Sequence, residues 1–110
     1  MKEAIEEIAK LRVRTDNSAP NGNREYNPGW HTCLDLPNML TVAEAVAKSA
    51  LARKESRGAH ARSDFLEKED DFGKINHQST LSPDGELQIA PLAATPIRED
   101  LQRIIDDNQK

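Results

Sequence analysis

The feature that most constrains the fold is an apolar stripe, about four helical turns long, in the middle of the chain. Asn27 can cap free N–H groups and Pro28 suits the first helical position, so a helix is expected to run from there to about Lys54. Pro37 removes one backbone hydrogen bond and is expected to kink or divide the helix, and Gly58 is a natural stop. The stripe follows the i, i+3, i+4, i+7 spacing of one helix face and consists of Leu36, Met39, Leu40, Ala43, Val46, Ala47, Ala50 and Leu51.

Shorter segments flank this helix. Residues 2–14 predict a first helix, because apolar side chains recur on one face while acidic residues come early and basic residues late. Residues 15–26 are rich in Asn, Gly, Ser and Pro and predict a connection. Residues 63–72 are acidic, and we expect an irregular segment anchored by Phe65, Leu66 and Phe72.

The last third of the chain predicts a β-hairpin and a final helix. Residues 74–91 alternate apolar and polar side chains around Ser82-Pro83-Asp84-Gly85, a turn in which proline presets φ and glycine accepts a positive φ. Such a hairpin is marginal in water unless it packs on something else. Thr95-Pro96 predicts the start of a helix with apolar residues at 97, 101, 104 and 105.

The predicted fold class is therefore mainly α: a small, spectrin-repeat-like helical bundle of one long kinked helix and shorter helices, with a hairpin-containing tail. We divide the chain into a helical domain, residues 1–72, and a tail, residues 73–110, packed on it. Hydrophobic residues make up 36% and aromatic residues 4% of the chain, which fits a domain that completes its core against a partner. The amphipathic pattern starts directly after Met1 without a cap signal, so we expect the chain to be cut from a longer one.

Several functional classes find no support in the residues. A net charge of −4 argues against nucleic acid as the main partner, and no apolar run approaches the roughly 20 residues of a membrane span. The spacing of His31, Cys33, His60 and His77 does not suit a metal site, and no Gly-x-Gly-x-x-Gly or other phosphate-binding loop is present. We therefore expect no catalytic residue, no metal ligand and no cofactor-binding residue in this chain.

The segment Glu55-Ser56-Arg57-Gly58-Ala59-His60-Ala61-Arg62 has the densest cluster of polar groups. In one interpretation it is an interface, in which Arg57 and Arg62 offer planar donor groups to carboxylates or carbonyls and His60 binds a neighbouring domain. In the other it caps the long helix, because basic residues favour the negative end of the helix dipole. The residues alone leave both interpretations open.

A family resemblance rests on four runs of sequence, at residues 24–31 (Arg-Glu-Tyr-Asn-Pro-Gly-Trp-His), 34–40, 43–45 and 50–62. With these runs the chain resembles the C-terminal helical domain of succinate dehydrogenase and fumarate reductase flavoprotein subunits. The resemblance is strong over residues 24–72, weaker over 1–23 and loose over 73–110. The second candidate is the C-terminal domain of L-aspartate oxidase, which shares this architecture and a related Glu-Ser-Arg-Gly run.

The resemblance implies a part of an enzyme that interconverts succinate and fumarate through FAD and passes electrons to an iron–sulfur subunit. It implies an intact complex that is cytoplasmic and peripheral on the inner face of the membrane, without direct membrane insertion. The flavin, the dicarboxylate and the catalytic acid belong to regions that precede this one, so no catalytic or substrate-binding residue carries over. The resemblance does imply that Glu55, Arg57, His60 and Arg62 face the FAD domain of the same subunit.

The function expected from the resemblance is structural and interface-forming. We expect no FAD binding and no succinate oxidation by this chain alone, and self-association through faces that a larger subunit would cover. The alternative from a different class is a free-standing helical adaptor whose apolar stripe captures an unrelated helix.

Overall fold

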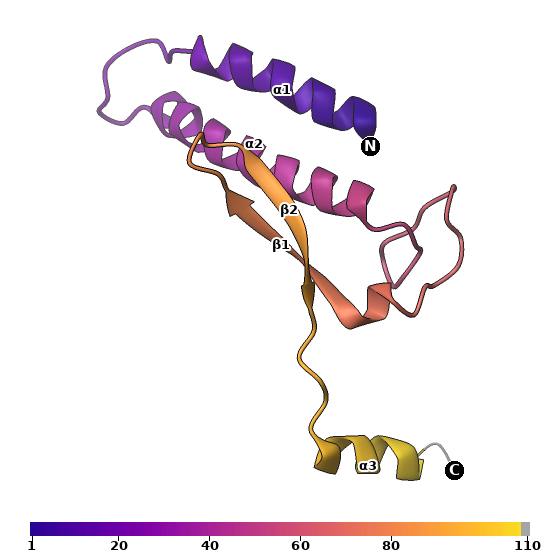
Figure 1. The fold of residues 1–110 in the computed structure, drawn as a ribbon. Helices are drawn as coiled ribbons and strands as arrows, with labels where there is room; N and C mark the ends of the chain where they lie inside the picture. The colour runs from indigo at the N-terminus through magenta and orange to yellow at the C-terminus, as the bar shows by residue number, and fades with distance from the viewer. Residues whose placement is uncertain (109–110) are drawn as a thin grey trace.

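Two antiparallel helices form the body of the molecule, and a β-hairpin lies against the longer one (Figure 1). The structure is a computed structural model that describes residues 1–108. Its elements, in chain order, are α1 (Lys2–Asp16), α2 (Pro28–Ala52), the 3-10 turn η1 (Phe72–Lys74), β1 (Ile75–Leu81), β2 (Leu87–Ala93) and α3 (Glu99–Asn108). This arrangement confirms the predicted mainly α fold with a β-hairpin.

Helix α2 begins with Pro28 at its first position, as predicted, and continues through Pro37 as one element of 25 residues. Asn27 occupies the capping position but its side chain makes no capping hydrogen bond. The Asn27 amide instead donates to the carbonyls of Asn21 and Asn23, both at 2.8 Å, and so closes the connecting loop.

Helix α2 ends at Ala52, close to the predicted end at about Lys54, but the chain leaves the helix well before Gly58, which was expected to stop it. Arg53 is already extended, with φ −78° and ψ 109°. Its guanidinium donates to the carbonyls of Phe72 at 3.0 Å and Ile75 at 3.2 Å, which draws the chain away from the helix axis.

The hairpin follows the predicted turn closely. Strands β1 and β2 are antiparallel, with Ile75 opposite Ala93 at the open end and Leu81 opposite Leu87 at the turn. Gly85 has the expected positive φ of 80°. The hairpin lies against α2, where the Lys48 ammonium donates to the Leu87 carbonyl at 2.9 Å.

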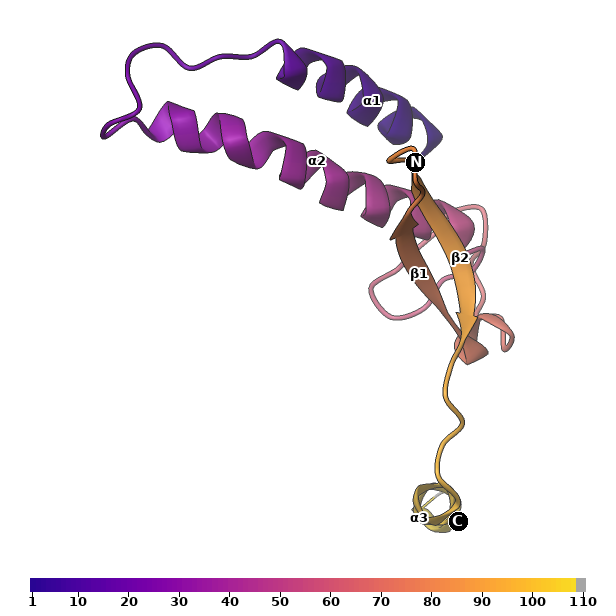
Figure 2. The same ribbon diagram turned by 60° about the vertical axis from the view of Figure 1, so that its left-hand side comes forward.

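Helix α3 begins at Glu99, later than the Thr95-Pro96 start predicted from sequence. The Arg98 carbonyl accepts hydrogen bonds from the Leu101 and Gln102 amides at the start of the helix. Residues 94–98 form an extended connection, and α3 lies beyond the open end of the hairpin, away from α1 and α2 (Figures 1 and 2). The hairpin thus lies against α2 whereas α3 does not, and the division of the chain into residues 1–72 and 73–110 stays a prediction.

The acidic segment 63–72 is irregular, as expected, but its anchors differ. Leu66 is 73% exposed, so it does not anchor the segment. The Phe72 ring stacks on His77 at 6.3 Å between centroids, and the Arg62 guanidinium lies 4.8 Å from the centre of the Phe65 ring. Phe65 and Phe72 thus make the expected contacts, with Arg62 and His77 as their partners, whereas Leu66 does not.

Hydrophobic burial is sparse. Among the residues that the structure describes, Leu40 is the one hydrophobic side chain classed as buried, while Glu55 and Arg62 are buried polar groups. Most large apolar side chains of α2 and α3 remain exposed. Over residues 1–108, no helix is both long and apolar enough to cross a membrane.

Candidate functional site

Glu55 is the centre of the polar segment that follows α2. Its side chain is fully buried and accepts three hydrogen bonds: from the Arg53 guanidinium, from Arg57 Nε at 2.9 Å, and from the backbone N–H of Glu69 at 2.9 Å. A buried carboxylate is tolerated when cations and donors satisfy it in this way. Glu55 therefore joins the end of α2 to a backbone segment 14 residues further along the chain.

These donors also fix the charge of Glu55. The hydrogen bond from Arg57, with those from the Glu69 amide and Arg53, lowers the pKa of the Glu55 carboxyl from 4.5 to about 2 against the opposing effect of burial. The same pair raises the pKa of Arg57. Glu55 is consequently ionised throughout the neutral range.

A tight turn projects from this cluster. The backbones of Arg57 and His60 exchange hydrogen bonds of 2.8 and 3.0 Å, and Gly58 sits between them with a φ of +58°. Arg57 also donates to the Glu69 carbonyl at 3.0 Å, which ties the turn to the acidic segment 63–72. Gly58 and Ala59 are exposed at the tip.

Arg62 caps the C-terminal end of α2. Its Nη1 donates to the carbonyls of Ala50, Leu51 and Arg53 at 3.3, 2.9 and 3.0 Å. These carbonyls belong to the last turn of α2 or directly follow it, where backbone acceptors lack helical partners and the dipole favours a cation. Nε and Nη2 bind the Asp64 carboxylate at 2.8 and 2.6 Å, and this pairing lowers the pKa of Asp64.

The four residues singled out from sequence thus have different roles within the chain. Glu55 and Arg57 form an ion pair, and Arg62 supplies the helix cap that was the alternative interpretation of the segment. His60 is joined to Arg57 through the backbone of the turn, and its Nε2 lies 3.3 Å from the Arg53 carbonyl oxygen, to which Arg62 also donates. Their contact with another domain stays a prediction.

Sequence reasoning missed Arg53 and Ser56, which complete the cluster. Ser56 Oγ donates to the Phe65 carbonyl at 2.7 Å and accepts from the Arg62 amide at 2.8 Å. The alternation Arg53-x-Glu55-x-Arg57 was the available signal, because residues two apart in an extended chain point to the same side. It was overlooked because this stretch was assigned to a helix.

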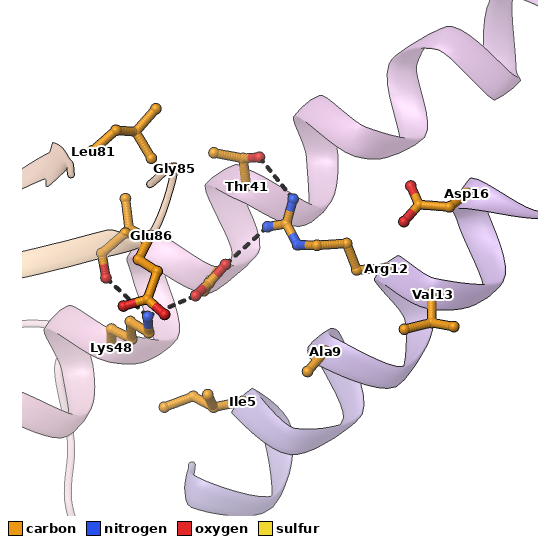
Figure 3. A pocket seen from close by; sticks show the side chains of 12 residues that line it. Ile5, Ala9, Arg12, Val13, Asp16, Thr41, Lys48, Leu81, Gly85 and Glu86 are labelled. Carbon is orange, nitrogen blue, oxygen red and sulfur yellow. Dashed lines mark hydrogen bonds and ion pairs between the residues drawn. The ribbon is translucent and has the colours of Figure 1, made fainter. Parts of the chain in front are cut away.

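A second polar cluster joins the two long helices. Figure 3 shows Arg12 reaching from α1 to α2, where its Nη2 lies 2.8 Å from Glu44. Lys48 binds the other oxygen of the same carboxylate at 2.7 Å. Hydrogen bonds from Lys48 and Arg12 lower the pKa of Glu44 despite some desolvation. This cluster lies in a pocket of about 560 Å³ that the hairpin turn also lines, and it pins α1 to α2.

Neither cluster gathers the ligands of a metal site. Over the described part of the chain, no group of three or more His, Cys, Asp or Glu side chains is placed to hold a metal ion. The buried arginines and carboxylates satisfy one another and nearby backbone groups. The hydrogen bonds of the first cluster tie residues 53–74 together at the end of α2.

Comparison with known proteins gives a consistent family. The family model described as "Fumarate reductase flavoprotein C-term" matches residues 1–105, a wider region than the sequence runs alone had indicated. The fumarate reductase flavoprotein subunit of Mycobacterium tuberculosis is 34% identical over 99 residues, covering 89% of this chain and 17% of that protein. The succinate dehydrogenase flavoprotein subunit of Coxiella burnetii is 34% identical over 97 residues, covering 87% and 16%.

A third relative extends the comparison. The 8-methylmenaquinol:fumarate reductase flavoprotein subunit of Wolinella succinogenes is 37% identical over 82 residues, which cover 73% of this chain and 13% of that protein. No solved structure matches. The chain spans less than one fifth of the length of these relatives. Because the family model covers nearly every residue, the chain belongs to the family of fumarate reductase flavoprotein C-terminal domains.

Proposed function

We propose that this chain is the docking module of a flavoprotein subunit that interconverts succinate and fumarate. In this proposal the FAD of the intact subunit supplies the redox chemistry, and an iron–sulfur subunit receives the electrons in a complex on the inner face of the membrane. The chain contributes no reacting group. It contributes a surface that meets the FAD domain.

The observation that carries the proposal is the large surface of the chain. A compact monomer of 12.3 kDa is expected to expose about 6,100 Å², whereas this chain exposes 8961 Å². Its radius of gyration is 20.0 Å, against about 13 Å for a compact domain of this length. A chain that leaves so much surface uncovered is suited to packing against a larger body.

The cluster around Glu55 supports a specific place for that contact. Its hydrogen bonds hold a turn whose exposed tip consists of the small residues Gly58 and Ala59, and the exposed Ala61 follows just after the turn. Small residues let a neighbouring backbone approach closely, and a preformed turn loses little entropy on docking. Glu55, Arg57 and Arg62 then act as positioning residues behind the interface, and His60 lies beside it.

The test uses the intact flavoprotein subunit that carries this module. The Arg57→Ala variant removes the hydrogen bonds to Glu55 and to the Glu69 carbonyl, so we expect a subunit with reduced FAD content that assembles poorly with its iron–sulfur partner. Arg14→Ala is the matched control, because Arg14 is an exposed arginine near the end of α1. Flavin absorbance per chain and co-purification measure the two effects, and unchanged values for Arg57→Ala would reject the proposal.

A further inference from the structure

Helix α3 presents an apolar ridge with no cover. Ile97, just before the helix, and Leu101, Ile104 and Ile105 within it are 56%, 46%, 57% and 39% exposed. Their spacing places them on one side of the helix. A helix of 10 residues is marginal in water by itself, so α3 needs a surface to pack on.

A groove that is partly apolar, like the ridge of α3, lies between α2 and β1. It has a volume of about 420 Å³, and Ala45, Val46 and Ala50 form its apolar part. Ser49 is also small, so a helix can approach α2 closely along this face. Val46 is 64% exposed and is thus available for contact.

The charges of the two surfaces are complementary. Arg53, His60 and His77 line the groove, and no carboxylate is among its lining residues. Behind the groove, the single carboxylate of Glu55 pairs with the guanidiniums of both Arg53 and Arg57, so this end of the groove keeps an excess of positive charge. Desolvation, then the neighbouring Arg53 and His60, lowers the pKa of His77 and so favours its neutral form. Within its bounds α3 carries four carboxylates and one arginine. An amphipathic acidic helix therefore suits this groove better than a neutral or basic one.

The connection before α3 directs the helix away from its own groove. The Ala94 amide is held by the Lys74 carbonyl at 2.8 Å, and Pro96 restricts the residue before it to extended conformations. Both views show α3 beyond the hairpin rather than folded back on α2 (Figures 1 and 2). From these features we infer that α3 of one copy of this chain docks in the groove between α2 and β1 of a second copy, which gives a dimer with exchanged helices.

Exchange of a terminal element is a common route to dimers because each chain can offer both the helix and the groove. The inference goes beyond the proposed function, because it concerns contact between two copies and requires neither flavin nor substrate. Its experiments use the 110-residue chain itself, so their failure would leave the Arg57 test in the intact subunit unaffected.

The first experiment measures dimer affinity by sedimentation equilibrium. Val46→Asp and Ile104→Asp each place a charge in the apolar contact, and we expect each to raise the dimer Kd by about tenfold or more. Val42→Asp is the matched control, because Val42 is also 64% exposed on α2 but does not line the groove. A monomeric parent chain, or equal weakening by Val42→Asp and Val46→Asp, would overturn the inference.

The second experiment identifies which copy supplies the helix. On a Cys33→Ser background, a chain with Val46→Cys is mixed with a size-tagged chain carrying Ile104→Cys and treated with a short bismaleimide cross-linker. We expect a product that contains both chains, and much less of it when Val42→Cys replaces Val46→Cys. Closure within a single chain that carries both Val46→Cys and Ile104→Cys, at high dilution and without mixed product, would show that α3 folds onto its own groove and would refute exchange.

Discussion

The turn at Gly58 offers the sharpest test of how the polar segment is built. Gly58 has a φ of +58°, and a methyl group added there would meet no other heavy atom within 4 Å. The change Gly58→Ala therefore adds no clash and tests backbone strain alone. Alanine in the left-handed region costs about 1–2 kcal/mol. Alanine also restricts the unfolded chain more than glycine does, which stabilises the folded state by about 0.4–1 kcal/mol. The net destabilisation is therefore about 1 kcal/mol.

Urea unfolding followed by helical circular dichroism measures this loss. For a small domain the denaturation midpoint should fall by roughly 0.5 M with an unchanged slope. Gly58→Asn should lose less, because asparagine tolerates this conformation better than alanine. Gly85→Ala, with a φ of +80° and equally open surroundings, should match Gly58→Ala. Equal stability of the alanine and asparagine variants at position 58, or no loss in either, would refute the turn conformation.

Three further changes test other parts of the structure. The ionised Glu55 should stabilise the fold fully above its ordinary pKa of 4.5, and this stabilisation should be lost as the pH falls toward about 2. The urea midpoint should therefore decrease between pH 4.5 and 2, and the part of this decrease that is due to Glu55 should be absent in Glu55→Gln. Leu40→Ala should destabilise by about 2–5 kcal/mol in the same unfolding assay, because Leu40 is the buried apolar residue of α2; a loss below about 1 kcal/mol would contradict its burial. Arg12→Ala should cost about 0.2–1 kcal/mol and increase amide hydrogen exchange in α1, because Arg12 is partly exposed where it binds Glu44, whereas Glu7→Ala at an exposed pair should change neither.

Local patterns predicted the regular elements well. The stripe of α2 and the Pro28 start depend on residues within a few positions of one another, and the Ser82–Gly85 turn sets its own backbone. Each of these signals comes from residues that are close together in the sequence, so it can be recognised without knowledge of the fold. The start of α3 was misplaced by a few residues, because Pro96 was taken as the first helical position and instead lies in the extended connection.

The end of α2 could not be read in the same way. Gly58 looked like a helix stop, yet the helix ends earlier because Arg53 binds carbonyls 19 and 22 residues away. Glu55 likewise depends on an amide 14 residues away. Polar side chains that recruit distant backbone groups leave no periodic signal. The composition of the segment therefore revealed that it was important but not how its residues pair.

The role of Arg62 at the proposed interface could not be decided from the sequence either. Arg62 was expected to meet another domain or to cap the helix, and sequence could not separate the two because an arginine suits both. The structure shows the cap directly, through three carbonyls at the end of α2. The proposed contact with an FAD domain instead involves the exposed tip of the turn, and no pattern in the sequence distinguished this tip from the charged residues around it.

The most direct measurement is calorimetric titration of this chain into the FAD-loaded flavin-binding region of a flavoprotein subunit of this family. We expect saturable binding of one chain per flavin domain, lost in Ala59→Trp at the tip of the turn and retained in Ala19→Trp on the exposed loop after α1. Binding that is absent for the unmodified chain, or equal for the two tryptophan variants, would contradict docking through this turn.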